Sequence, residues 1–191
     1  MKHAEIGQEC DFVPDANITK NALASSMKKL MKEKQFEKIS VIDICEGCGM
    51  NRKSFYYHFK DKYDLVNWIF YTDFIKTASK RSYTDGWDLL TAVVELFSSD
   101  RSFYKAALEI KGQNSFRDYF YEATVPIFSM FSEAMIADGT VLDPHYFTDA
   151  FLVIMYRWLS QKRDQSPEEF IGSLKKVLVK VGRDISRSED A

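Results

Sequence analysis

The sequence has no apolar run near the ~20 residues that a membrane-spanning helix requires, so we expect no membrane anchor. Its first ten residues, MKHAEIGQEC, lack the apolar stretch of a signal peptide. Cysteine is scarce, with three residues in all, and this odd count argues against a disulfide-bonded scaffold. Together these absences predict a cytoplasmic protein in a reducing compartment.

Sequence signatures of catalysis are missing as well. The chain contains no glycine-rich phosphate loop, no H-E-x-x-H and no G-x-S-x-G motif. Its three histidines, His3, His58 and His145, are scattered along the chain. We therefore predict that the protein is not an enzyme and that it binds neither a metal ion nor another cofactor.

Length and composition favour a helical protein with a packed core. The 191 residues allow one large or two small domains, and 46% of them are hydrophobic. Apolar positions recur at helical spacing without strand-like alternation, which predicts an all-α fold. The net charge of −2 conceals an asymmetry, since residues 18–62 carry +5 and the remainder −7. A basic module joined to an acidic one is typical of a nucleic-acid reader attached to a domain with another task.

Residues 40–59, SVIDICEGCGMNRKSFYYHF, form a helix-turn-helix pattern. Ser40 and Asp43 have the spacing of a capping box at the start of a short helix. Gly49 can take the left-handed conformation that ends such a helix, and Asn51 can cap the next one. Phe55 and Phe59 share the inner face of that second helix. Cationic, hydroxyl and aromatic groups are left to face outward, as in a DNA-reading helix.

This region resembles the N-terminal domain of the TetR family of transcription regulators. The resemblance covers about residues 18–65, and Tyr56-x-His58-Phe59 followed by Lys62 is its most specific part. It implies an N-terminal three-helix DNA-binding domain with a helix-turn-helix, followed by a helical C-terminal domain for dimerisation and effector binding. A narrower resemblance, to the branch containing the dihydroxyacetone kinase operon activator, rests on residues 62–70 and on the aromatic body. That branch implies a protein coregulator in place of a small-molecule effector.

Ten residues are candidates for DNA contact. Arg52 and Lys53 can donate to guanine, and Tyr57 can reach a base edge or a phosphate. The resemblance assigns Tyr56, His58 and Lys62 to the DNA backbone, and places Thr19 near the phosphates at the start of the first helix. Thr19 as a plain helix cap and His58 as a buried imidazole remain alternatives. The full set is Thr19, Ser40, Asn51, Arg52, Lys53, Ser54, Tyr56, Tyr57, His58 and Lys62.

Cys45 and Cys48 form a C-x-x-C pair that supports a competing hypothesis. Such a pair can act in redox chemistry or bind metal. A helical redox-sensing or protein-interaction module without DNA binding is therefore the alternative function. No second pair of ligands has matching spacing, which favours small apolar fillers packed within the motif.

We divide the chain into five segments. They are a mobile arm (1–17), the DNA-binding domain (18–62), a linking helix (63–82), an effector and dimerisation domain (83–185) and a tail (186–191). The first helix is predicted over residues 18–34 and the linking helix over 61–82. Further helices are predicted over residues 87–98, 101–111, 114–138, 143–163 and 167–183, with Pro126 kinking or breaking the third of these.

The body carries two further predicted surfaces. An effector pocket would be lined by aromatic side chains, although aromatic residues at helical spacing are more often plain core: Phe103, Tyr104, Phe116, Tyr119, Phe120 and Phe131. The last two helices carry apolar stripes that the resemblance assigns to a dimer interface: Phe147, Phe151, Met155, Trp158, Phe170, Leu174, Val177 and Leu178. The expected partners are a palindromic operator in double-stranded DNA, a second copy of the chain, and a small-molecule or protein effector.

Overall fold

The computed structural model describes most of the chain. Its backbone is described for residues 13–78, 83, 85–135, 143–161 and 165–188. Within these helices, the side chains of residues 13–16, 130–135, 178–179 and 181–188 lie outside the described part. The predictions on residues 1–12, on the side chains of Phe131 and Leu178, and on the end of the tail therefore fall outside it.

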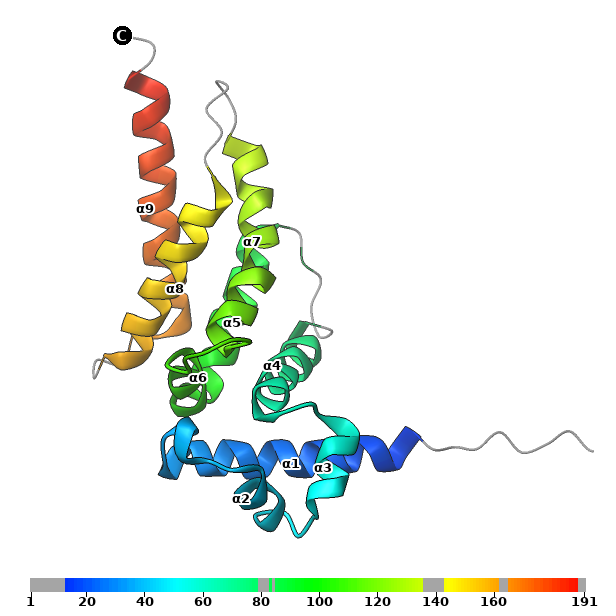
Figure 1. Ribbon diagram of the computed structural model, residues 1–191. Helices are drawn as coiled ribbons and strands as arrows, with labels where there is room; N and C mark the ends of the chain where they lie inside the picture. The colour runs from blue at the N-terminus through cyan, green and yellow to red at the C-terminus, as the bar shows by residue number, and fades with distance from the viewer. Residues whose placement is uncertain (1–12, 79–82, 84, 136–142, 162–164, 189–191) are drawn as a thin grey trace, which may run out of the picture.

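The described residues are helical and contain no strand, which confirms the all-α fold. Helices α1, α2 and α3 form the base of the molecule, which we call the foot. Helix α4 leads upward from the foot, and α5–α9 form the body above it (Figure 1). In chain order the elements are α1 (Val13–Glu33), the 3-10 helix η1 (Phe36–Lys38), α2 (Val41–Glu46), α3 (Arg52–His58), α4 (Lys62–Ala78), α5 (Gly86–Ser99), α6 (Arg101–Leu108), α7 (Phe116–Met135), α8 (Pro144–Ser160) and α9 (Pro167–Ser188). None of the described helices is long and apolar enough to cross a bilayer.

Helix α1 begins five residues earlier than predicted, at Val13 instead of Ile18. Pro14 does not mark an irregular arm. It lies in the first helical turn, where its missing N–H would have no intrahelical partner anyway. The predicted apolar stripe of α1 is confirmed, with Leu23, Met27 and Met31 buried.

The helix-turn-helix is held by the local signals that its sequence contains. Ser40 and Asp43 form the capping box of α2. Gly49 has φ +68°, and the N–H groups of Gly49 and Met50 donate to the carbonyls of Glu46 and Cys45 at 3.3 and 2.9 Å. This pair of bonds is a Schellman ending, which requires the left-handed residue at Gly49. Phe55 and Phe59 are buried as predicted.

Helix α1 is locked against α2 at one close contact. The buried hydroxyl of Ser26 donates to the carbonyl of Ile44 at 2.8 Å. A Cβ atom added at Gly47 would lie 2.2 Å from that hydroxyl oxygen. Only glycine fits at this position while the bond between Ser26 and Ile44 is kept.

The body is built around stacked aromatic rings. Phe97 of α5 and Tyr104 of α6 stack with ring centroids 4.3 Å apart, and Phe116 and Phe120 of α7 stack at 5.9 Å. Phe70 of α4 meets the same cluster edge-on. Helix α7 is a single helix through Pro126, so the proline does not break it.

Several helix ends in the body differ from the predicted ones. Helix α6 ends at Leu108, before the predicted Lys111, whereas the predicted end of α4 at Ser82 lies outside the described residues. Helix α9 runs to Ser188, beyond the predicted Arg183. A capping residue marks the start of a helix in the sequence, whereas the last turn of a helix frays and is harder to place.

We expect Gly47→Ala and Gly49→Ala to destabilise the protein for different reasons. The new Cβ at position 47 meets the Ser26 hydroxyl, and overpacking of this kind costs about 1–3 kcal/mol. Position 49 has open space around it but a left-handed backbone, which costs about 1–2 kcal/mol for alanine.

Guanidinium unfolding followed by circular dichroism measures both free energies. Adding Ser26→Ala should restore part of the stability lost in Gly47→Ala and none of that lost in Gly49→Ala. Additive effects of Ser26→Ala in both backgrounds would contradict the close contact.

Candidate nucleic-acid interface

Helix α3 presents its polar residues to solvent. Asn51 caps the helix by accepting a hydrogen bond from the Ser54 N–H at 2.9 Å. Arg52 and Lys53, in the first turn, are exposed. With Phe55 buried beneath them, these side chains can point only outward. The predicted arrangement of a reading helix is therefore present at its N-terminal end.

The two tyrosines of α3 extend this exposed face. Tyr57 is 77% exposed and Tyr56 is 51% exposed. The guanidinium carbon of Arg52 lies 5.9 Å from the centre of the Tyr56 ring. Phenol groups this exposed have their hydroxyls free to meet a base edge or a phosphate.

His58 and Lys20 lie together at the end of α3. The imidazole is half-buried and packs edge-on against Tyr57 with ring centres 4.9 Å apart. Partial burial, and then the charge of Lys20, lower the pKa of His58. The ring is therefore neutral at physiological pH, and it can donate one N–H without carrying a charge.

Lys20 is a site residue that the sequence analysis did not select. Its ammonium lies 5.9 Å from the Phe59 ring centre and 5.7 Å from the Trp68 ring centre. These aromatic faces hold a cation of α1 beside the end of α3. No local motif marks Lys20, because the rings that position it come from two other helices.

Thr19 is not at a helix start. It is half-buried inside α1, which begins at Val13. The free N–H groups of a helix start, which could hold a phosphate, lie more than a turn earlier. The predicted position of Thr19 at the start of the first helix is wrong, and its contact with DNA, which the resemblance implies, stays a prediction.

The hydroxyl of Ser40 is already engaged by Asp43. Ser40 Oγ accepts from the Asp43 N–H at 3.1 Å and donates to the Asp43 carboxylate at 2.7 Å. The bonds from Ser40 and the ammonium of Lys34, 3.0 Å away, hold the pKa of Asp43 well below its usual range. A phosphate here would meet a fixed carboxylate, so we withdraw Ser40 as a phosphate ligand.

Lys62, a predicted DNA contact, is bound to backbone carbonyls of its own chain. Its ammonium donates to the carbonyl oxygens of Phe36 and Ile39, both at 2.8 Å, and to that of Glu37 at 3.4 Å. It also lies 4.3 Å from the centre of the Phe36 ring. Burial lowers the pKa of Lys62. All three N–H donors are occupied, and they fasten the start of α4 to the turn before α2.

The surroundings of Cys45 and Cys48 disfavour reaction of their thiols. Cys45 is buried, and Cys48 donates weakly to the carbonyls of Ile44 and Cys45 at 3.4 and 3.5 Å. Burial raises the pKa of both thiols. A raised pKa disfavours the reactive thiolate, so the arrangement favours apolar fillers over a redox pair. Among the described residues, no group of three or more histidine, cysteine or carboxylate side chains could hold a metal ion.

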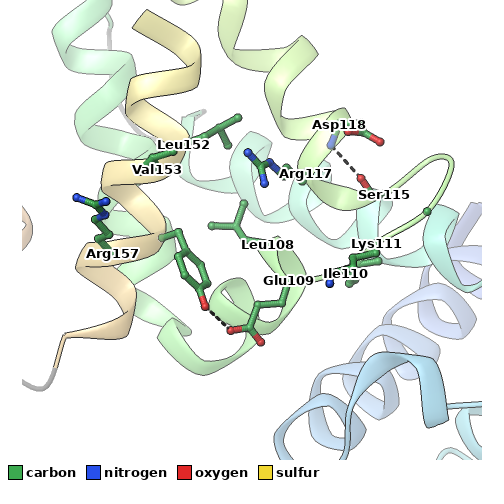
Figure 2. A pocket seen from close by; sticks show the side chains of 12 residues that line it. Leu108, Glu109, Ile110, Lys111, Ser115, Arg117, Asp118, Leu152, Val153 and Arg157 are labelled. Atoms are coloured by element: carbon green, nitrogen blue, oxygen red, sulfur yellow. Dashed lines mark hydrogen bonds between the residues drawn. The ribbon is translucent and has the colours of Figure 1, made fainter. Parts of the chain in front are cut away.

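The predicted effector pocket is filled by its own residues. Phe103, Tyr104, Phe116 and Phe120 are at most 1% exposed and contact one another ring to ring. Tyr119 is partly buried against the same core. These side chains therefore form the packed centre of the body. An open groove lies elsewhere, between the loop after α6 and the face of α8 (Figure 2).

The predicted dimer stripes are also largely internal. Phe151, Met155, Trp158 and Phe170 are buried within one chain, and Trp158 stacks on Phe170 with ring centres 4.9 Å apart. Phe147 and Leu174 are partly buried against this core, and among the members whose side chains the structure describes only Val177 is exposed, at 59%. The buried members of the stripes hold α8 and α9 to the body, and the predicted dimer contact of these helices stays a prediction.

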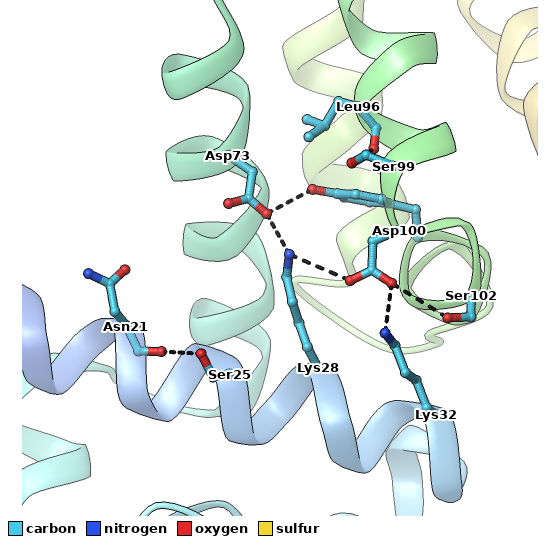
Figure 3. Close-up of polar contacts among 10 residues, drawn as sticks. Asn21, Ser25, Lys28, Lys32, Asp73, Leu96, Ser99, Asp100 and Ser102 are labelled. Atoms are coloured by element: carbon cyan, nitrogen blue, oxygen red, sulfur yellow. Dashed lines mark hydrogen bonds and ion pairs between the residues drawn. The ribbon is translucent and has the colours of Figure 1, made fainter.

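A polar cluster joins the foot of the molecule to the body (Figure 3). The ammonium of Lys28, on α1, lies 2.7 Å from the Asp73 carboxylate on α4 and 3.7 Å from Asp100 at the start of α6. Lys32 lies 3.2 Å from Asp100. The hydroxyl of Tyr104, whose ring is in the aromatic core, donates to Asp73 at 3.3 Å. Groups from both parts of the molecule therefore meet at one point.

Comparison with known proteins finds matches along both parts of the chain. The family model described as "Bacterial regulatory proteins, tetR family" matches residues 26–69. The model described as "Transcriptional regulator C-terminal region" matches residues 86–180. Between them they cover the helix-turn-helix and most of the body.

One curated relative is the HTH-type dhaKLM operon transcriptional activator DhaS of Lactococcus lactis, 29% identical over 104 residues. The match spans 54% of this chain and 54% of the relative, about half of its length.

Two solved structures have a similar fold. The structure of a dihydroxyacetone kinase operon activator, DhaS, superposes with a TM-score of 0.63 at 22% identity, covering 87% of this chain and 97% of that one. NalD of Pseudomonas aeruginosa, described as the secondary repressor of a multidrug efflux pump, gives a TM-score of 0.62 at 18% identity over 87% and 96%. At these identities the likeness shows the fold alone.

We expect Lys62→Met to lower stability without changing how operator binding depends on salt. The substitution keeps the apolar stem but leaves the partly buried carbonyls of Phe36 and Ile39 without this donor, at a cost of about 1–3 kcal/mol. Exposed Lys60 is the matched control, and Lys60→Met should leave the free energy of unfolding nearly unchanged. A phosphate contact by Lys62 would instead reduce the slope of log affinity against log salt by about 1. Finding that reduction at unchanged stability would refute the structural role.

Proposed function

Because the chain belongs to the TetR family of bacterial transcriptional regulators, we propose that it binds a palindromic operator as a homodimer, with α3 of each copy in the major groove. The observation that carries this proposal is the outer face of α3. Arg52, Lys53 and Tyr57 are exposed there over a buried Phe55. A short helix presenting two cations and a phenol from its first turns suits direct reading of base edges.

Contacts to the DNA backbone come from the residues that flank this face. Tyr56 offers a hydroxyl, His58 a neutral N–H and Lys20 a charge, all near the end of α3. Contacts of this kind set the register of the helix, and the base contacts of Arg52 and Lys53 set the sequence. Asn51 and Ser54 act through the cap, which fixes the direction of the first turn.

The second copy binds at the edge of the body formed by α8 and α9. These helices lie together at one side of the molecule (Figure 1), and each keeps an exposed apolar residue on its outer surface. Ile154 of α8 is 37% exposed and Val177 of α9 is 59% exposed. Pairing the same two helices from both copies would bury these residues in a four-helix contact and place two reading helices on one duplex face.

The effector, a small molecule or a protein, acts by shifting the population of protomer arrangements that fit the operator. The filled aromatic core supports a site on an outer face of the body rather than at its centre. The cluster of Lys28, Asp73 and Asp100 is the physical link by which such a site can reach α1.

The placement of α3 in the major groove of DNA is tested by Arg52→Ala. Loss of a base-contacting arginine should cost about 1–3 kcal/mol of binding and relax the preference at one base position. Fluorescence anisotropy with DNA from upstream of the protein's own coding region measures this, and a randomised-site selection then reports the preference. Lys176→Ala, which removes an exposed cation on α9, should bind like the wild type. Equal affinity of all three proteins would contradict the placement of α3 in the groove.

The dimer surface is tested by Val177→Glu. A carboxylate buried in an apolar contact should raise the dimer dissociation constant by about tenfold or more, measured by sedimentation velocity. Ile75→Glu is the matched control, because Ile75 is 47% exposed on α4, away from α8 and α9. Trp158→Ala should instead lower the stability of the chain by about 3–5 kcal/mol as a core substitution. Dissociation in Ile75→Glu but not in Val177→Glu would place the interface elsewhere.

A further inference from the structure

The groove between the α6–α7 loop and α8 has the size of a ligand site. Its volume is about 830 Å³, within the range of small-molecule pockets in proteins. Its wall contains the apolar side chains of Leu108, Leu152 and Val153. Figure 2 shows Leu152 and Val153 on α8, Leu108 at the end of α6, and Arg117 extending above Leu108. The groove therefore has an apolar patch with the Arg117 guanidinium close to it.

Arg117 makes no ion pair with any described residue. Lys111 and Arg157 also line the groove, so the cations outnumber the two carboxylates, Glu109 and Asp118. A guanidinium is always charged and matches a carboxylate with two parallel hydrogen bonds. The complementary ligand has a carboxylate head for Arg117 and an apolar body for the leucine-lined wall.

A hydrogen bond across the groove sets the direction of such a ligand. The hydroxyl of Tyr156, on α8, donates to the Glu109 carboxylate, just past the end of α6, at 2.8 Å (Figure 2). The Glu109 carboxylate repels a second acidic group. The groove thus favours a single negative charge, held at the Arg117 end.

Helix α6 connects this groove to the DNA-reading part at both of its ends. Asp100, at its start, lies within ion-pair distance of Lys28 and Lys32 of α1. Glu109 and Ile110, just past its end, line both the 830 Å³ groove and a second groove of about 430 Å³. The wall opposite them in the second groove includes Phe36 and the end of α1. A ligand in the first groove therefore contacts residues that also face the end of α1.

We propose that this groove binds a soluble monocarboxylate with an apolar chain, and that occupancy changes operator affinity through α6. The second part rests on the proposed function, and the first does not. Octanoate is the probe, because it combines the carboxylate with a chain that can cover the apolar wall. Octanamide, of equal length but uncharged, and acetate, which lacks the chain, are the matched controls.

Isothermal titration of the full-length protein tests the binding. Octanoate should bind, and octanamide and acetate should each bind at least about tenfold more weakly. Arg117→Gln should reduce octanoate affinity by a similar factor, and Lys176→Gln should leave it unchanged. Arg117 is exposed, so its substitution should not unfold the protein, and circular dichroism is the check. Equal binding of octanoate and octanamide, or full affinity in Arg117→Gln, would overturn the proposal.

Operator affinity measured with and without octanoate tests the coupling. The dissociation constant for operator DNA should shift by about fivefold or more in the wild type and remain constant in Arg117→Gln. Without octanoate the two proteins should bind DNA equally. Binding of octanoate with no shift would overturn the coupling, whereas failure of both proteins to bind any operator would refute the proposed function alone. If Arg117→Gln changes the dimer dissociation constant, the groove is a contact between copies and the ligand site is wrong.

Discussion

Lys28 holds the molecule together at the point where its two parts meet. Its ammonium, on α1, reaches a carboxylate on α4 and another at the start of α6. The side chains of Lys28, Asp73 and Asp100 are 26%, 25% and 18% exposed, so water screens these pairs only in part. These ion pairs lie beside a hydrophobic core that continues from the DNA-reading foot into the body and includes Met31 and Ile110. Ion pairs of this kind can exchange partners at small cost, which a packed apolar seam cannot do.

The aromatic core explains why a signal must enter from outside. The rings of Phe97, Tyr104, Phe116 and Phe120 occupy the centre of the body, and a close-packed interior transmits displacement better than it absorbs it. Tyr104 belongs to this core and yet reaches Asp73 with its hydroxyl. Burial and the nearby carboxylates of Asp73 and Asp100 raise the pKa of Tyr104, so the hydroxyl stays a donor at every physiological pH. A displacement of α6 is therefore transmitted to Asp73 through the rigid ring of Tyr104.

The features predictable from sequence were those that neighbouring residues determine. The capping box at Ser40, the Asn51 cap and the left-handed Gly49 all depend on groups within a few positions, and the structure contains each of them. The sequence did not predict the carbonyl partners of Lys62, because they lie more than twenty residues away. The stripes of α8 and α9 were recognised as apolar, but periodicity does not say whether an apolar face meets its own chain or a second copy. Lys20, Lys28 and Arg117 were not identified either, because their surroundings depend on how helices distant in sequence pack together.

Two junctions connect the foot to the rest of the molecule, one at the start of α4 and one where α1 meets α6, and they are held by different kinds of contact. The start of α4 is capped by the Asp61 carboxylate, which accepts from the N–H groups of Tyr63 and Asp64 at 2.9 Å. Lys62 ties the same end of α4 to the foot through its hydrogen bonds to the carbonyls of Phe36 and Ile39. The seam at Lys28 and Lys32 is held by partly hydrated charges and bordered by an open groove. Rotation is therefore easier at the seam. Since α1 has 21 residues and is about 31 Å long, a small shift where α6 meets its end becomes a larger displacement of α3 on the operator.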